Sequence, residues 1–300
     1  MKIGIGIPNA VPGTSGRLLL DWARRAEERG FSGLATIDRV IYPSYDSLSV
    51  LAAAAGATSR IELMTNILAA PVYPPVLLAK STASIDQLSG GRLTLGLALG
   101  ARADDYAAVG QDFHTRGRDF DNALDVLHRA WRGEPVGPGV TDAKAGGRTA
   151  ADALAVGPTA STNGRIPVLI GGTSDKAIQR VVTWGAGWTA GGGTAEEARP
   201  VLERVHAAWQ DAGRQGEPRL AALTYYSLGE EVGEASRASL RHYYSWLGDY
   251  AEVIAEGAVR SDISIRDTVA QFEDVGVTEL YFGPTVASLE QVDRLADLVL

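Results

Sequence analysis

The stretch from Thr58 to Gly100, TSRIELMTNILAAPVYPPVLLAKSTASIDQLSGGRLTLGLALG, decides the fold class. Its pattern predicts a strand over 61–68, a helix over 76–88 that stops at Gly90 and Gly91, and a second strand over 93–99. Two strands joined by a helix run parallel, because a parallel pair needs a crossover of this kind. The stretch therefore predicts an α/β protein with a parallel sheet.

The same alternation continues in both directions along the chain. Short β-branched or leucine-rich runs predict eight strands, at 3–7, 34–37, 61–68, 93–99, 166–170, 188–190, 220–228 and 278–282. Helical patterns follow them, at 18–29, 48–58, 76–88, 119–131, 174–183, 195–212, 236–254, 265–275 and 289–298. Eight such units in 300 residues favour closure into a single (β/α)8 barrel (TIM barrel), with an open doubly wound sheet as the alternative. We expect one domain over 1–300, insertions after strands 4 and 7, and a long loop or lid over 133–165.

Composition and charge exclude several function classes. The chain has 28 basic and 36 acidic side chains, and its net charge of −8 with no basic stripe argues against nucleic-acid binding. With no cysteine, disulfides, thiolate catalysis and cysteine-ligated metals are excluded. The four histidines lack metal-ligand spacing, and no nucleophile elbow or P-loop is present. No long apolar run or signal-peptide core occurs, so we expect a cytoplasmic protein with no membrane contact.

The residues that follow the strands are the candidate site, because a barrel of this kind places its active site at the carboxyl ends of its strands. They include Pro8, Asn9, Asp38, Arg39, Thr65, Asn66, Ile67, Gly100, Ala101, Arg102, Tyr225 and Tyr226. Asp38 and Arg39 are either functional or a surface ion pair. Asn66 is either functional or a turn residue. Tyr106, in a short helical insertion after strand 4, either covers a flat ring or belongs to the core.

After strand 5, the sequence Gly171-Gly172-Thr173-Ser174 opens a helix. Two glycines let a ligand approach the backbone, and the start of a helix offers free N–H donors to an anion. The pattern indicates a phosphate site, and its alternative is an ordinary tight turn capped by the threonine.

Three segments resemble the bacterial-luciferase-like family of flavin-dependent oxidoreductases and monooxygenases. They are the opening stretch, DDYAAVGQDFHTRGRDFDNALDVL at 104–127, and IPVLIGGTSDKAIQRVVTWGAGW at 166–188. The likeness covers almost the whole chain, and the order of AK, IDQLSGGR and a glycine-spaced fourth strand is its specific part. It implies a single luciferase-like barrel domain that uses FMN or the 8-hydroxy-5-deazaflavin coenzyme.

The resemblance also implies roles for matching positions. Thr65-Asn66-Ile67 matches the place where the family has a non-proline cis peptide behind the isoalloxazine ring. Ala98 to Gly100 would border that ring, and Gly171, Gly172, Thr173 and Ser174 would hold the cofactor phosphate. Asp38 matches an acidic residue that fixes the cofactor edge in several members. With Tyr106 added, these residues are the predicted cofactor site, and Asp38 and Arg39 are the predicted catalytic pair.

Two positions depart from the family pattern. Arg39 stands where many members have a histidine, and Ala101 stands where the deazaflavin sugar dehydrogenases have a glutamate. Both changes remove a group that titrates near neutral pH, because arginine stays protonated. Proton abstraction from a sugar is therefore not expected. Arg39 is instead expected to bind an anionic substrate or to stabilise a flavin peroxide or a reduced-flavin anion.

The favoured interpretation is a monooxygenase that receives reduced FMN from a separate flavin reductase and acts on a small organic substrate. The alternatives are a deazaflavin-dependent reductase or dehydrogenase, and a non-catalytic flavin-binding protein. FMN is favoured because the expected rim offers few cations for the polyanionic tail of the deazaflavin coenzyme: Arg102, the stretch from Arg116 to Arg118, and Lys176.

Two further expectations concern surfaces. The helix LSVLAAAAGA at 48–57 has almost no polar face, which favours a homodimer, and the dimers of the resembled family use this region. The aromatic segment at 242–246, with Tyr250, either lines a pocket above the barrel or packs between helices.

Overall fold

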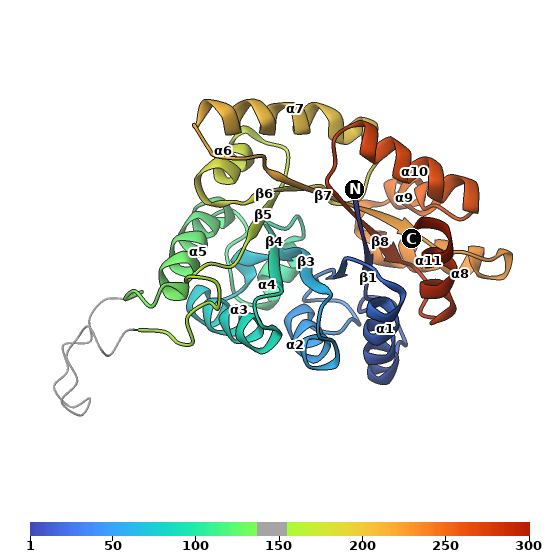
Figure 1. Cartoon of the computed structure of the whole chain (residues 1–300), viewed down its shortest axis with the longest axis horizontal. Coiled ribbons are helices and arrows are strands. Elements are labelled where there is room, and N and C mark those ends of the chain that lie inside the picture. The colour runs from blue at the N-terminus through green and yellow to red at the C-terminus, as the bar shows by residue number, and fades with distance from the viewer. Residues whose placement is uncertain (137–154) are drawn as a thin grey trace.

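Eight parallel strands form a closed barrel with helices around it (Figure 1). The computed structural model describes residues 1–136 and 155–300. The strands are β1 (Lys2–Gly6), β2 (Gly33–Thr36), β3 (Glu62–Ala69), β4 (Leu93–Ala98), β5 (Val168–Gly171), β6 (Gly187–Thr189), β7 (Arg219–Tyr226) and β8 (Glu279–Pro284). They pair in chain order, and β8 pairs with β1 to close the barrel. The predicted TIM barrel is confirmed.

Helices follow every strand and cover the outside of the barrel. They are α1 (Gly16–Arg29), α2 (Ser47–Ala57), α3 (Pro75–Ser89), α4 (Ala103–Ala108), α5 (Arg116–Trp131), α6 (Asp175–Trp184), α7 (Ala195–Asp211), α8 (Gly233–Tyr243), α9 (Tyr250–Gly257), α10 (Asp262–Asp274) and α11 (Glu290–Val299). The expected insertions are α4 after β4, and α8 with α9 after β7. Gly30 and Gly90 end α1 and α3 in the left-handed conformation that glycine adopts most readily.

One predicted helix is wrong in extent, and one predicted loop is described only in part. The stretch 236–254 is not continuous: a 3₁₀ turn (Ser245–Leu247) and Gly248, with a φ of 59°, separate α8 from α9. The positive φ breaks the helical path, which periodicity alone does not reveal. Of the predicted loop or lid over 133–165, residues 137–154 lie outside the described residues.

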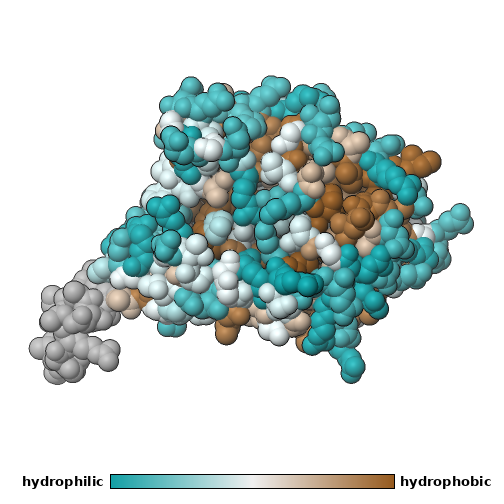
Figure 2. All heavy atoms as spheres, in the orientation of Figure 1, coloured by the Kyte–Doolittle hydropathy of each residue, from teal (hydrophilic) through white to brown (hydrophobic). Residues whose placement is uncertain are grey.

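Outer helices carry the polar surface, and the core lies between them and the barrel. In the face shown in Figure 2, hydrophilic residues cover most of the outer elements and hydrophobic residues gather between them. Trp22 of α1 and Trp131 of α5 are fully buried where their helices pack on the barrel. No helix within 1–136 and 155–300 is both long and apolar enough to cross a bilayer.

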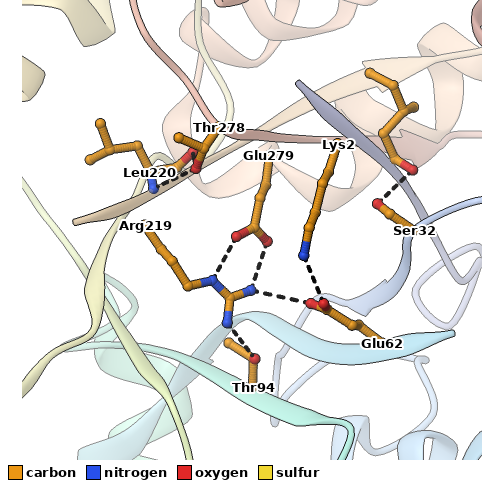
Figure 3. Close-up of polar contacts among 9 residues, drawn as sticks. Lys2, Ser32, Glu62, Thr94, Arg219, Leu220, Thr278 and Glu279 are labelled. Atoms are coloured by element: carbon orange, nitrogen blue, oxygen red, sulfur yellow. Dashed lines mark hydrogen bonds and ion pairs between the residues drawn. The ribbon is translucent and has the colours of Figure 1, made fainter. Parts of the chain in front are cut away.

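A polar network closes the amino-terminal end of the barrel (Figure 3). Arg219 at the start of β7 pairs with Glu279 of β8, with an Nε–Oε1 distance of 2.6 Å, and with Glu62 of β3 at 3.3 Å. It also donates to the hydroxyl of Thr94 in β4, and Lys2 of β1 reaches Glu62 at 2.9 Å. Five strands are thus joined at this end, so the opposite end is left for a ligand.

Candidate active site

A cavity of about 380 Å³ opens at the carboxyl ends of the strands, where barrels of this type carry their active sites. Its lining comes from the ends of β3, β4 and β5, from the glycines that follow β6, and from β7 and α8. Of the predicted site residues, Asp38, Asn66, Ile67, Ala98, Gly100, Tyr106, Gly171, Gly172 and Ser174 line it. Thr65, Thr173 and Arg39 are not among its lining residues.

The end of β3 is irregular, and Asn66 and Ile67, which lie in the irregular part, both line the cavity. The register of β3 against β4 shifts between Thr65 and Leu68, and the Asn66–Ile67 peptide bond is cis, at the predicted position. Thr65 faces the barrel wall, where its hydroxyl donates to the Gly96 carbonyl at 2.9 Å.

The Asn66 amide forms a hydrogen bond through its oxygen, but its nitrogen has no partner among the described residues. Its Oδ1 accepts from the Thr189 hydroxyl at 2.8 Å. Its Nδ2 is buried and has no partner within the described residues. A buried donor without an acceptor costs free energy, so the amide is suited to a ligand atom that accepts a hydrogen bond.

The loop from β5 to α6 lines the cavity, and two of its carbonyl groups are engaged by protein donors. Ser174, not Thr173, caps α6, and its Oγ accepts from the Ala177 N–H at 3.2 Å. The carbonyls of Gly172 and Thr173 accept from Trp188 and Arg204, each at 2.8 Å. The protein thereby engages these carbonyl oxygens, and the first-turn N–H groups other than that of Ala177 have no intrahelical partner, which suits an anion.

Both glycines of this loop are needed for its shape. Gly172 has a φ of 107°, a conformation that other residues rarely adopt. A Cβ at Gly171 would lie 2.9 Å from Cδ1 of Ile67 and 3.2 Å from Cβ of Ala98. Gly171 therefore lets β5 approach the two residues that form the cavity floor beside it.

Asp38 is partly buried at the cavity and forms no surface ion pair with Arg39. Its Oδ1 accepts from the Tyr73 hydroxyl at 2.9 Å, and its Oδ2 accepts from the Ala69 N–H at 3.2 Å. Burial raises the pKa of Asp38 to about 6, against the lowering effect of these two hydrogen bonds. The carboxyl group therefore titrates close to neutral pH.

Arg39 faces other protein groups. Its guanidinium lies 3.2 Å from the Asp104 carboxylate, and its Nε lies 3.9 Å from that of Asp105. The side chain is only 7% exposed and lies over the rings of Tyr42 and Tyr243. An anionic substrate would have to compete with these carboxylates for Arg39, and the catalytic role stays a prediction.

Tyr106 combines the two alternatives that the sequence left open. It is 1% exposed, its hydroxyl donates to the Leu99 carbonyl, and its ring packs edge-on against Phe113. It also lines the cavity beside Gly100, whose φ is 71°. Asn9, in contrast, is wholly structural: its amide bonds to Ile37 and Tyr45, and it does not reach the cavity.

Some residues that line the cavity were not predicted from the sequence. Arg180 of α6 lies at the cavity, paired with Asp121 at 2.6 Å. Gly191 and Gly192 also line the cavity. Their place after β6 is the only feature of the sequence from which they could have been predicted. From the aromatic segment, Tyr243, Tyr244 and Trp246 line the cavity, so the pocket alternative is right for these three. Tyr250 is 54% exposed and lies elsewhere.

The cavity suits a flat ring system with an anionic tail. Glycines from three strand ends leave room, the Asn66 amide offers one donor, and the start of α6 offers an anion site. In the part of the chain that is described, no cluster of carboxylate and imidazole groups is arranged to hold a metal ion.

Comparison with known proteins decides the family. The model of the luciferase-like monooxygenases matches residues 1–276. The chain belongs to the luciferase-like monooxygenase family. Pyrimidine monooxygenase RutA of Variovorax paradoxus is 26% identical over 269 residues, which cover 84% of this chain and 68% of that protein. The resemblance inferred from the three sequence segments is thereby confirmed.

Solved structures show the same fold across most of the chain. An F420-dependent secondary alcohol dehydrogenase, in complex with an F420–acetone adduct, has a TM-score of 0.78 at 16% identity. The similarity covers 99% of this chain and 98% of that one. The oxygenating constituent of 3,6-diketocamphane monooxygenase from Pseudomonas putida, in complex with FMN, has a TM-score of 0.72 at 15% identity and covers all of this chain and 97% of that one.

Proposed function

We propose that this luciferase-like protein is a monooxygenase that uses reduced FMN on a small organic substrate. The observation that carries the proposal is that one cavity holds both the Asn66 amide, whose Nδ2 has no partner among residues 1–136 and 155–300, and the start of α6, which is suited to an anion. A flavin phosphate requires an anion site, and the heteroatoms of an isoalloxazine ring accept hydrogen bonds. RutA and the diketocamphane enzyme, both monooxygenases by name, support the choice of reaction.

In this proposal, Gly171, Gly172 and Ser174 hold the phosphate, and Asn66 and Ile67 support the ring. When bound, reduced FMN would supply the electrons for oxygen activation, and a separate flavin reductase would deliver it. The protein orients the ring against the substrate and excludes water through the aromatic wall of Tyr243 and Tyr244. Asp38, close to its pKa at neutral pH, holds or releases a proton at the cavity edge.

FMN is preferred over F420, the 8-hydroxy-5-deazaflavin coenzyme, because two of the four expected rim cations are engaged by the chain itself, which leaves only Arg102 and Lys176 for a polyanionic tail. Arg116 donates to the Phe113 carbonyl and lies over that ring, and Arg118 pairs with Asp119 at 3.4 Å. One phosphate can be bound by a helix start without a cationic rim, whereas a polyanionic tail cannot.

Fluorescence titration of the full chain with FMN and with F420, at about 0.15 M salt, tests the cofactor because exposed charges are well screened there. We expect tighter binding of FMN, followed by oxygen consumption when reduced FMN is supplied. Asn66→Ala should weaken FMN binding by about tenfold through the loss of a donor. Thr189→Val, which removes only the hydroxyl that holds Asn66, should weaken it less.

Three outcomes would contradict parts of the proposal. F420 binding that is tighter than FMN binding by about tenfold would reverse the cofactor and favour hydride transfer. Binding of neither would overturn the flavin site. FMN binding without oxygen consumption would favour the non-catalytic flavin-binding protein.

A further inference from the structure

Arg102 is a cation placed among aromatic rings at the mouth of the cavity. It directly precedes α4, and its side chain is among the cavity lining. Its guanidinium carbon lies 4.8 Å from the ring centre of Tyr243, 5.0 Å from that of Trp246 and 5.8 Å from that of Tyr244. The rings stabilise the charge electrostatically, but they accept none of its N–H hydrogen bonds well.

No anion neutralises Arg102 within the described residues. Its Nε is buried without a hydrogen-bond partner, and the guanidinium forms no ion pair in that part of the chain. Two nearby arginines differ in this respect: Arg39 is paired with Asp104, and Arg180 with Asp121. A guanidinium in this setting lacks the planar oxygen acceptor that its N–H fork matches.

The carboxylates of the cavity are not free to serve as that acceptor. Asp38 accepts from Tyr73 and from the Ala69 N–H. Asp105 accepts from the Val40 and Ile41 N–H groups, at 3.1 and 2.7 Å. Among the described residues, the carboxylates that line the cavity thus leave Arg102 without an acceptor, which a bound ligand could supply.

We propose that Arg102 binds the carboxylate of the substrate, and that this substrate is a planar aromatic acid whose ring packs on Tyr243 and Trp246. The inference rests on the proposed function, because it names the substrate class of the same cavity. A carboxylate matches the guanidinium fork, and a flat ring matches the aromatic wall beside it. The cofactor phosphate is assigned to the start of α6, which belongs to a different element.

Calorimetric titration of the full chain, with and without saturating FMN, tests this with three probes: benzoate, its neutral analogue benzamide, and acetate. Benzoate should bind at least about tenfold more tightly than benzamide, through charge-assisted hydrogen bonds, and more tightly than acetate, through ring packing. In Arg102→Gln the preference for benzoate over benzamide should disappear. Arg102→Lys should retain part of it, because the charge remains and the fork is lost.

Arg17→Gln is the matched control, since it removes the same charge from an exposed residue of α1 outside the cavity. It should leave all three affinities unchanged. An Arg102→Gln protein that binds benzoate as the wild type does, or a wild type without a preference for benzoate, would overturn the inference. So would a loss of FMN binding in Arg102→Gln with benzoate binding intact, because Arg102 would then serve the cofactor. If the wild type binds benzoate through Arg102 but no FMN, the inference stands and the proposed function fails.

Discussion

Asp38 is the residue whose ionisation couples the cavity to pH. Its folded-state pKa of about 6 exceeds the ordinary value of 3.8, because burial disfavours the charged form. Ionising Asp38 in the folded protein therefore costs free energy of folding. This cost is absent below pH 3.8 and reaches its full value above about pH 6. We therefore expect Asp38→Asn to gain stability relative to the wild type between pH 4 and 7, by on the order of 2 kcal/mol.

Urea unfolding at several pH values in this range measures the change, and Asp211→Asn, at the exposed end of α7, is the control. The informative quantity is the slope of the difference with pH, since the asparagine also alters the hydrogen bonds to Tyr73 and Ala69. A difference that does not vary with pH would mean that the carboxyl titrates alike in both states.

At the scale of residues, a place directly after a strand was enough to predict which residues line the cavity. It was not enough to predict which side chains pair with one another. Asp38, Asn66 and Gly172 could be found from the sequence because barrel topology brings strand ends together. The pairing of Arg39 with Asp104 could not, because it joins residues 65 positions apart on loops whose path no local pattern determines. For the same reason, the sequence does not reveal that Arg102 lacks an ion-pair partner in the described part of the chain.

At the scale of elements, the turn from β5 to α6 links fold and cofactor binding. Gly172→Val places a β-branched side chain at a φ of 107°, with its Cβ 3.3 Å from that of Ala177. We expect a local cost of about 1–3 kcal/mol and at least about tenfold weaker FMN binding, because the side chain fills the approach to the helix start.

Gly276→Val is the matched control for this turn. Gly276 has a φ of 88° and follows α10, outside the cavity. Urea unfolding and FMN fluorescence titration of both variants separate the two effects. A similar loss of stability with intact FMN binding is expected for Gly276→Val. FMN binding that survives in Gly172→Val would make the turn an ordinary one.

The strands could be predicted from the sequence, whereas one break between two helices could not. All eight strands were found to within two residues at either end, because alternating short apolar runs and amphipathic helices are strong local signals. The break between α8 and α9 was missed, since Tyr244 to Leu247 continue a helical pattern while Gly248 adopts a positive φ. Trp246 lies in that break and lines the cavity, so the error concerned a residue of the candidate site.

At the scale of the whole molecule, Arg219 holds the closed end of the barrel together (Figure 3). Arg219→Met leaves the buried Glu279 without its partner, which should cost about 3–5 kcal/mol. Adding Glu279→Gln should recover part of the loss, because the uncompensated charge is removed. Urea unfolding measures both, and FMN titration should show unchanged affinity, since the network lies at the opposite end from the cavity. An Arg219→Met protein of wild-type stability would show that barrel closure does not depend on the network.

The proposed homodimer is the largest-scale prediction, and neighbouring helices α2 and α3 indicate its surface (Figure 1). The large apolar residues of α2 are buried within the chain, and its outward residues are small. Leu77 and Leu88 of α3 are 61% and 70% exposed on one helical stripe.

We expect the wild type to scatter light with a mass of twice 31.6 kDa at micromolar concentration, and Leu77→Asp to shift it toward the monomer. Ile263→Asp changes an equally exposed apolar residue on α10 and should leave the mass unchanged. A wild-type mass of 31.6 kDa would remove the dimer, and equal effects of both substitutions would place its interface elsewhere.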